Sequence, residues 1–442
     1  MVDRDQDIDR SKGLTLVDRY QGLPTLAKWK VALLEYGVDL QDPNTFTDYE
    51  GISQYKTKRA VKSPVVEKFQ FKDSSDNNSL IPSEVIITEE GTEKTSLVKL
   101  GYRKGSPILI DRRGDEIFMV DKKTGNRIPV DINLVKNRAY TSATLPESIN
   151  PDQPKLEDLV QVVGQDRIGV LAFSGCWYWT SNNPCKFCDS NPKREDELSA
   201  MPSLNTFADS KFNEEDWWEQ YKEDYLKGVK YAFKYVLDNE EVGPHRHFQL
   251  MAGNLIRTER VWDICGQIAE TLNQVEPLSD FDSYLNISPP IRNVEESLRR
   301  AKEQLGFRQV AFNMEVIGKA RFKEVCPGKY STIGYDNSIN ALKAAVPIFG
   351  RGNVRSNFVL GAQPVEELLD GVRELAEQGI ASDYSVFVPK PGTPWAGRPS
   401  PDIKTIIDFT NELVVIYKRQ GFKGIYCGLS SRSNIFHEVL AG

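Results

Sequence analysis

Long apolar segments and histidines are scarce in this sequence. No window approaches the roughly 18 apolar residues that a membrane helix needs. The first 13 residues are charged from the third position onward and lack the apolar run of a secretory signal. Only 3 histidines and 6 cysteines occur in 442 residues. So few cysteines argue against a disulfide framework, and we therefore expect a cytoplasmic protein with reduced thiols and no membrane contact.

An excess of basic charge is also missing. The formal net charge is -7 and the isoelectric point is about 5.4, which argues against a general electrostatic grip on nucleic acid. Hydrophobic residues make up 40% of the chain, with 31 glycines and 24 prolines, as in ordinary globular proteins. A chain of this length and composition can form one large domain and a smaller one.

The first 160 residues differ from the rest of the chain in the pattern of their apolar and charged segments. Mixed apolar and charged segments before residue 70 favour helices. Short β-branched and apolar runs separated by glycine-containing turns follow, at 84–88, 107–110 and 116–120. This pattern predicts a smaller α+β accessory domain over residues 1–160, in which helices accompany a small antiparallel sheet.

From residue 161 onward, apolar strands alternate with amphipathic helices, which indicates βα units and a parallel sheet. The predicted strands are 168–173, 248–252, 283–287, 309–315, 354–360 and 384–388, and the helices between them include 262–272, 294–305, 338–348 and 364–378. Six such units are fewer than the eight of a complete barrel. The predicted fold class is therefore α/β, a partial (β/α)6 TIM-like barrel over residues 161–442 with a C-terminal extension. In such barrels function gathers at the carboxyl ends of the strands.

Three cysteines, Cys176, Cys185 and Cys188, follow the first predicted strand of this barrel within one short loop. Their spacing, Cys-x8-Cys-x2-Cys, offers three soft thiolate ligands. Three thiolates on a four-iron cluster leave one iron open to bind another molecule. We therefore expect a metal site in this loop.

A structural zinc site in a barrel protein without radical chemistry is the alternative. Structural zinc usually binds two paired ligand clusters, and the chain has no second cysteine pair. The nearest candidates for a fourth ligand, Asp189, His245 and His247, would have to fold back onto the loop. The three-thiolate stoichiometry favours an iron-sulfur cluster instead.

The cysteine loop resembles the cluster loop of the radical S-adenosylmethionine (radical SAM) superfamily, with biotin synthase-like barrels as the nearest pattern. The usual spacing there is Cys-x3-Cys-x2-Cys, so the first gap is longer here. Phe187 keeps the aromatic position before the last cysteine, which in the family packs near the cofactor adenine. The resemblance implies a [4Fe-4S] cluster at the three cysteines. It also implies S-adenosylmethionine as cofactor and reductive cleavage to a 5′-deoxyadenosyl radical that abstracts hydrogen from substrate.

The resemblance also assigns cofactor-binding candidates to the ends of later strands. By position they are Ala252, Gly253 and Asn254 in a Gly-Gly-Glu-like turn, Glu315, Arg355, Ser356 and Asn357, and Val388 in the proline-rich segment 387–395. Each has a plainer alternative: a turn before a helix for 252–254, a surface salt bridge for Arg355, and a rigid connector for 387–395. A carboxylate that closes an apolar strand is costly to bury, so Glu315 is expected to face a ligand.

The remaining reactive residues give weaker signals. Cys265, Cys326 and Cys427 are expected to be buried or incidental thiols rather than ligands of a second cluster. The resemblance implies a flavodoxin- or ferredoxin-type electron donor and a small-molecule substrate, with a peptide as the alternative. The sequence names neither the substrate nor any catalytic side chain.

Overall fold

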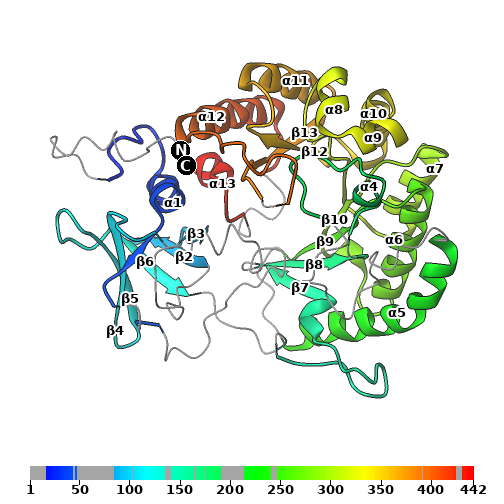
Figure 1. The fold of residues 1–442 in the computed structure, drawn as a ribbon, viewed down its shortest axis with the longest axis horizontal. Coiled ribbons are helices and arrows are strands. Elements are labelled where there is room, and N and C mark those ends of the chain that lie inside the picture. The colour runs from blue at the N-terminus through cyan, green and yellow to red at the C-terminus, as the bar shows by residue number, and fades with distance from the viewer. Residues whose placement is uncertain are drawn as a thin grey trace.

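The structure is a computed structural model. It describes residues 16–42, 45–46, 84–101, 103–134, 140, 142–163, 166–173, 175–190, 214–239, 246–390, 392–424 and 431–442. Within these residues the strands form two separate sheets, each with an apolar core of its own (Figure 1). None of the helices described is long and apolar enough to cross a membrane.

The smaller sheet belongs to the N-terminal part of the chain. Its strands, in order across the sheet, are β1 (Asp39–Leu40), β4 (Ile108–Arg113), β5 (Glu116–Asp121), β6 (Val130–Leu134), β2 (Glu84–Glu89) and β3 (Thr95–Lys99). Neighbouring strands are antiparallel except β1 and β4. Helix α1 (Thr25–Tyr36) shares one buried cluster with this sheet, which joins Trp29 and Leu33 to Val85 and Ile110. The predicted small antiparallel sheet is confirmed.

The larger sheet carries the predicted βα units. Its order is β13 (Ile380–Val386), β12 (Val354–Leu360), β11 (Gln309–Ala311), β10 (Asp282–Asn286), β9 (His247–Met251), β8 (Arg167–Leu171) and β7 (Val160–Val163). The six strands from β8 to β13 are parallel, and β7 is antiparallel at one edge. The sheet ends at β7 and β13 without closing. The predicted six-stranded partial barrel is therefore confirmed.

Helices cover the outer side of the larger sheet (Figure 1). They are α5 (Glu214–Asn239), α6 (Thr258–Asn273), α7 (Val294–Arg299) with a π-helical turn at Arg300–Gln304, α8 (Lys319–Val325), α9 (Pro327–Thr332), α10 (Tyr335–Phe349), α11 (Val365–Glu377) and α12 (Ile403–Gln420). Shorter elements are α4 (Trp177–Thr180), α13 (Phe436–Ala441) and the 3-10 turns Leu156–Asp158 and Leu278–Asp280. Helix α11 shows why these segments form: Leu368, Val372 and Leu375 repeat at helical spacing and are buried in the main apolar core.

Helices α1 and α13 lie side by side in a buried joint between the sheets (Figure 1). Lys30 of α1 is fully buried, and its Nζ donates to Glu438 Oε1 of α13 at 2.8 Å and to the carbonyl oxygen of Ser431 at 2.6 Å. Ser96 of β3 donates to the same carboxylate oxygen at 2.6 Å. Burial lowers the pKa of Lys30, and the carboxylate of Glu438 opposes this shift. The C-terminal helix is thus tied to the N-terminal sheet.

Candidate metal and cofactor site

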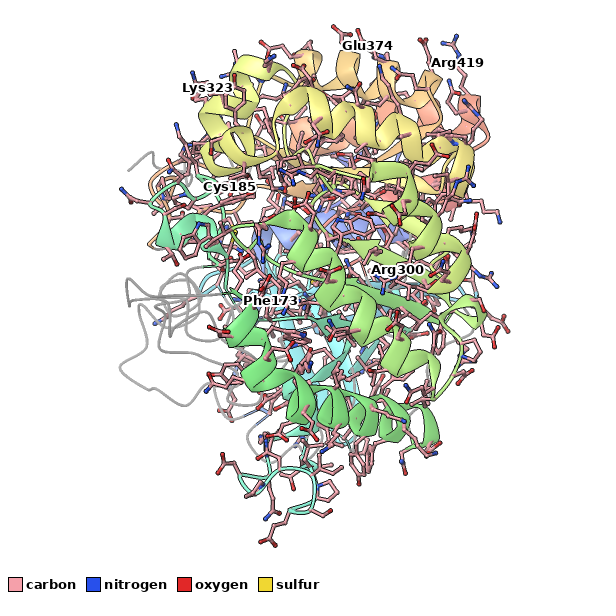
Figure 2. The ribbon with its side chains drawn as sticks, turned by 90° about the vertical axis from the view of Figure 1, so that its right-hand side faces the viewer. Phe173, Cys185, Arg300, Lys323, Glu374 and Arg419 are labelled. Carbon is pink, nitrogen blue, oxygen red and sulfur yellow. The ribbon has the colours of Figure 1, made fainter. Side chains whose placement is uncertain are left out.

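The cysteine loop leaves the sheet at the carboxyl end of β8, the first parallel strand. Figure 2 shows Cys185 on the same side of the molecule as Phe173, which follows β8, and away from Arg300 at the carboxyl end of α7. The long gap after Cys176 holds the single helical turn α4. The backbone then turns at the second pair, where the Cys188 N–H donates to the Cys185 carbonyl at 3.0 Å. The extra residues of the gap therefore form an ordered turn beside the loop.

The three thiols influence one another, and Cys176 and Cys185 are buried while Cys188 is partly buried. Burial raises the pKa of Cys176 to about 12, and the charges of Cys188 and Cys185 add to the effect. Burial and then the charge of Cys185 raise the pKa of Cys188. The pKa of Cys185 is raised first by a hydrogen bond with Cys326 and then by burial. Each thiol therefore resists ionisation without a cation, and a metal supplies the cation that favours the thiolates.

The donor chemistry of these residues fits an iron-sulfur cluster, since thiolates are its usual protein ligands. In the described part of the chain, no group of three or more Cys, His, Asp or Glu residues is close enough to hold a metal ion as it stands. The three cysteines are thus gathered in one loop without the geometry of a preformed site.

The turn after β9 packs directly on the cysteine loop. A Cβ at Gly253 would overlap the carbonyl oxygen of Gly175 and lie 3.4 Å from Cys176 Cα, so only glycine fits. The Trp177 N–H donates to the Asn254 carbonyl at 2.8 Å, and the Asn254 amide lies 3.9 Å from Cys176 Sγ. Asn254 Oδ1 is buried and makes no hydrogen bond to the described residues. The structure therefore brings the candidates 252–254 to Cys176, and their contact with a cofactor stays a prediction.

The segment after β13 covers the other half of the loop. The Trp395 N–H donates to the Lys186 carbonyl at 3.0 Å, and the rings of Trp395 and Phe187 are 6.5 Å apart. Lys390 Nζ pairs with Asp189 Oδ1 at 2.9 Å. Val388, two residues before Lys390, is 48% exposed. The proline-rich segment thus packs against the cysteine loop. Both alternatives, a segment that lines the cofactor and a rigid connector, predict this contact.

Glu315 closes the segment after β11 and faces inward. Its backbone adopts φ of +67°, a strained value for a residue with a side chain, and hydrogen bonds to Asn357 and Val359 hold it against β12. Its carboxylate accepts from Lys329 Nζ at 2.7 Å, and this ammonium also donates to the Asn313 carbonyl at 3.0 Å. The carboxylate expected to face a ligand therefore pairs with a protein cation, and its contact with a ligand stays a prediction.

Sequence reasoning missed Lys329. Burial opposes its charge, but the charges of Glu315, Cys185 and Cys326 outweigh burial and raise its pKa. A cation is therefore held beside the cysteine loop. The only signal in the sequence was its place directly after Cys326, Pro327 and Gly328, in a segment that already resembles the family pattern.

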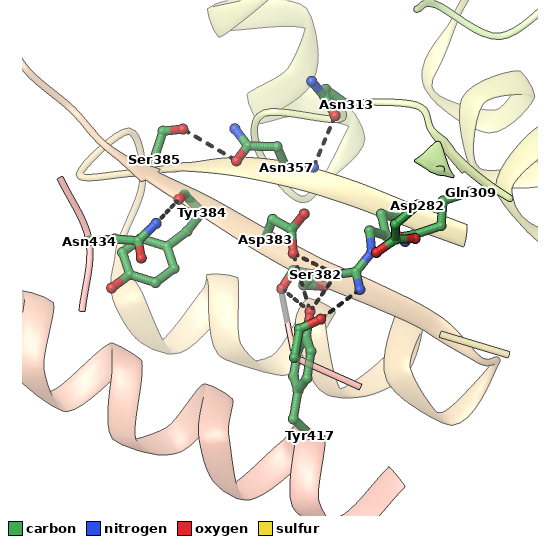
Figure 3. A network of polar contacts seen from close by, with 12 residues as sticks. Asp282, Gln309, Asn313, Asn357, Ser382, Asp383, Tyr384, Ser385, Tyr417 and Asn434 are labelled. Carbon is green, nitrogen blue, oxygen red and sulfur yellow. Dashed lines mark hydrogen bonds and ion pairs between the residues drawn. The ribbon is translucent and has the colours of Figure 1, made fainter. Parts of the chain in front are cut away.

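Arg355 belongs to a buried polar layer on the face of the sheet that carries alternate residues of each strand. Figure 3 labels Gln309, Asp383 and Tyr417 of this layer, and Arg355 donates to all three. Arg355 donates from Nε to Gln309 Oε1 at 2.7 Å, from Nη1 to Asp383 Oδ1 at 2.9 Å and from Nη2 to the Gly424 carbonyl at 3.0 Å. Its side chain is 2% exposed, so the alternative of a surface salt bridge is wrong and the ion pair is internal. A cofactor role for Arg355 stays a prediction.

The same layer continues to β9 through Asp282 and His247. Gln309 donates to Asp282 Oδ1 at 2.6 Å, and His247 lies 3.2 Å from Asp282 and 3.3 Å from Asp166. His247 is the first residue of β9 and is paired with Arg167, the first residue of β8. It therefore lies at the end of the sheet opposite the cysteine loop, which removes it as a fourth zinc ligand. His245 and Cys427 lie outside the described residues, and Cys265 is buried within α6.

Ser356 and Asn357 point to opposite faces of β12, as strand alternation predicts. Ser356 Oγ is buried and accepts from the Met314 N–H at 3.0 Å. Asn357 joins a row of side chains near the carboxyl ends of the strands, where its backbone N–H donates to Asn313 Oδ1 at 3.2 Å (Figure 3). Asn313 Nδ2 in turn donates to Asn286 Oδ1 at 3.0 Å. A backbone N–H can only donate, so Asn313 must present its oxygen to Asn357 and its amide nitrogen to Asn286. Asn286 therefore accepts with its oxygen, and its own amide hydrogens remain for other acceptors.

Comparisons with known proteins give distant similarities. No family model matches the chain. The chain is similar to the bacteriochlorophyllide c C-7(1)-hydroxylase of Chlorobaculum limnaeum, with 29% identity over 266 residues, 58% of this chain and 60% of the relative. The match thus spans less than two thirds of that relative's length.

Solved structures of similar shape include three of low identity. They are HydG, a maturase of the [FeFe]-hydrogenase (15% identity, TM-score 0.38, 61% of this chain and 53% of that chain), the radical SAM enzyme coproporphyrinogen III oxidase HemN from Escherichia coli (13%, 0.35, 61% and 57%), and a radical SAM methyltransferase from Sphaerobacter thermophilus (14%, 0.39, 72% and 75%). With TM-scores below 0.5, these similarities do not identify a function. The open parallel sheet, with the cysteine loop after its first parallel strand, agrees with the predicted fold class.

Proposed function

We propose that this chain is a radical SAM enzyme. In this proposal it reductively cleaves S-adenosylmethionine at a [4Fe-4S] cluster held by Cys176, Cys185 and Cys188, and the 5′-deoxyadenosyl radical abstracts hydrogen from a small-molecule substrate. The bound cluster would supply an electron and an open iron for the cofactor.

One observation carries the proposal: segments from separate strand ends converge on the cysteine loop. The turn 252–254 touches Cys176, the Glu315 and Lys329 pair lies beside Cys185, and Trp395 is fastened to Lys186. These contacts involve segments that the resemblance had assigned to the cofactor. A structural zinc loop gives no reason for that convergence.

The chain's own residues would bind the cofactor and exclude water. Phe187 and Trp395 offer aromatic faces for the adenine, and the buried side-chain oxygen Oδ1 of Asn254 would accept from a cofactor donor. The Asn286 side-chain oxygen is occupied by Asn313, so its amide hydrogens would donate to an acceptor on the cofactor or substrate. A reactive radical attacks whatever lies nearest, so positioning by these groups would choose the product.

The relative named above favours an oxidation. That protein is, by its name, a hydroxylase of bacteriochlorophyllide c, and we propose this compound as the first substrate to test. A flavodoxin- or ferredoxin-type protein would supply electrons. Because the described cysteines are free thiols, the proposed location is the cytoplasm.

The test is an anaerobic assay for 5′-deoxyadenosine with S-adenosylmethionine and dithionite. The wild type should be brown, absorb broadly near ~400 nm and form 5′-deoxyadenosine. Cys176→Ala, Cys185→Ala and Cys188→Ala should each lose colour and product, whereas Cys265→Ala, a buried thiol away from the loop, should keep both. A colourless wild type with bound zinc would support the structural-zinc alternative, and a cluster retained in all three loop variants would refute the proposal.

A further inference from the structure

Two backbone hydrogen bonds join two segments that are far apart in the sequence, at the cysteine loop. The Lys186 N–H donates to the Val325 carbonyl at 2.9 Å, and the Gly328 N–H donates to the Asn183 carbonyl at 3.1 Å. One segment is the second half of the cysteine loop, and the other is the junction between α8 and α9. The two hydrogen bonds lie on either side of Cys185 and of Cys326.

The register of these bonds places Cys185 opposite Cys326. Residue 186 is matched with 325 and residue 183 with 328, so moving one position inward from the first pair matches 185 with 326. Each cysteine is a chain neighbour of a residue in the first of these hydrogen bonds, so the bond holds the two Cα atoms close together. A disulfide needs a Cα separation of about 4.4–6.8 Å.

Electrostatics and packing agree with this placement. A hydrogen bond with Cys326 is the first cause of the raised pKa of Cys185. Gly328 keeps the segments close, because a Cβ there would lie 2.6 Å from the Asn183 carbonyl oxygen. Cys326 is fully buried and Cys185 is 8% exposed, so their neighbours hold them in place.

We propose that Cys185 and Cys326 form a reversible disulfide when the loop holds no metal. A small-molecule disulfide such as glutathione disulfide would be the oxidant: the two thiols lose two protons and two electrons to the new S–S bond, and glutathione disulfide is reduced to two glutathione molecules. The disulfide itself is independent of the proposed function. Its consequence rests on that function, since the bond removes one of the three cluster ligands and so excludes the cluster.

The experiment uses the full chain, purified anaerobically and treated with glutathione disulfide. Free thiols would be alkylated, the protein digested without reductant, and cross-linked peptides identified by mass spectrometry. We expect a peptide pair joined through Cys185 and Cys326, a fall of two in the 6 thiols of the chain, and full reversal by dithiothreitol.

Two matched variants sharpen the test. Cys326→Ser should remove the cross-link yet still bind iron, because Cys326 is not a proposed ligand, while Cys265→Ser should keep the cross-link. Melting curves of both variants would show that each is folded. A link between Cys185 and Cys188, or no link in the treated wild type, would overturn the proposal. A Cys185 to Cys326 link in a chain that never binds iron supports the disulfide and refutes the proposed function, so the two failures are distinguishable.

Discussion

Gly253 controls how closely the end of β9 approaches the cysteine loop, because a side chain there would displace the Gly175 carbonyl. We expect Gly253→Ala to lower the iron content of reconstituted protein several-fold and to leave the fold intact, since the strain falls on a loop. Gly397→Ala is the matched control, because its Cβ would meet no atom within 4 Å. Iron content and absorbance measure the cluster, and a melting curve shows that each variant is folded. Equal iron content in both variants would contradict the role of Gly253.

The ion pair between Glu315 and Lys329 is buried, with side-chain exposures of 12% and 13%. Removing one partner leaves an uncompensated charge, so Lys329→Met should lower the free energy of unfolding by about 3–5 kcal/mol. The double variant with Glu315→Gln should be more stable than Lys329→Met alone, because no unpaired carboxylate remains. Urea unfolding of the wild type, both single variants and the double variant measures the coupling. Additive effects would show that the two side chains do not interact.

Residues at the strand ends were predictable because parallel strands bring their following loops to one edge. The resemblance assigned Gly253 and Glu315 to such strand ends, and the structure brings both to the cysteine loop. The rule could not place Lys329 or Cys326, which reach the loop through the packing of α8 and α9 on residues 183–186. Such packing joins residues more than a hundred positions apart and leaves no periodic signal.

At the scale of the elements, apolar runs identified all six parallel strands. The last began too late in the prediction, because β13 starts at Ile380, directly after Gly379 with φ of +87°. Polar residues such as Ser382 and Asp383 obscured the pattern there. Asp383 is polar because it pairs with Arg355 in the buried layer.

That polar layer also joins strands through Asp282, and it predicts a pH dependence. Burial would raise the pKa of Asp282, but hydrogen bonds from His247 and Gln309 and the positive charges of His247 and Arg355 hold it below its usual value. A lowered carboxyl pKa stabilises the fold fully above the unfolded value of about 3.9, and this contribution is lost as the pH falls through the lower folded pKa.

Asp282→Asn should therefore lower the free energy of unfolding near neutral pH, and the difference from wild type should shrink below about pH 4. The loss should be only about 1 kcal/mol, because this carboxylate side chain is 37% exposed and partly screened by water. Urea unfolding at descending pH measures it. A difference that stays constant from neutral to acid pH would show that the charge of Asp282 does not contribute.

At the scale of the whole molecule, the joint around Lys30 and Glu438 ties the N-terminal sheet to the C-terminal helix beside the partial barrel. Both side chains are almost fully buried, at 0% and 2% exposure, and Ser96 donates to the same carboxylate.

Lys30→Met keeps the apolar stem but leaves Glu438 without its cation, so it should lower the free energy of unfolding by about 3–5 kcal/mol. Lys28→Met on the same helix is the control, since Lys28 is only partly buried. If the joint couples the two parts, Lys30→Met should also make residues of α13 and β3 exchange amide hydrogens faster together. Faster exchange in α13 alone would mean that the C-terminal helix is held by its apolar contacts with α12 and that the ion pair does not connect the two sheets.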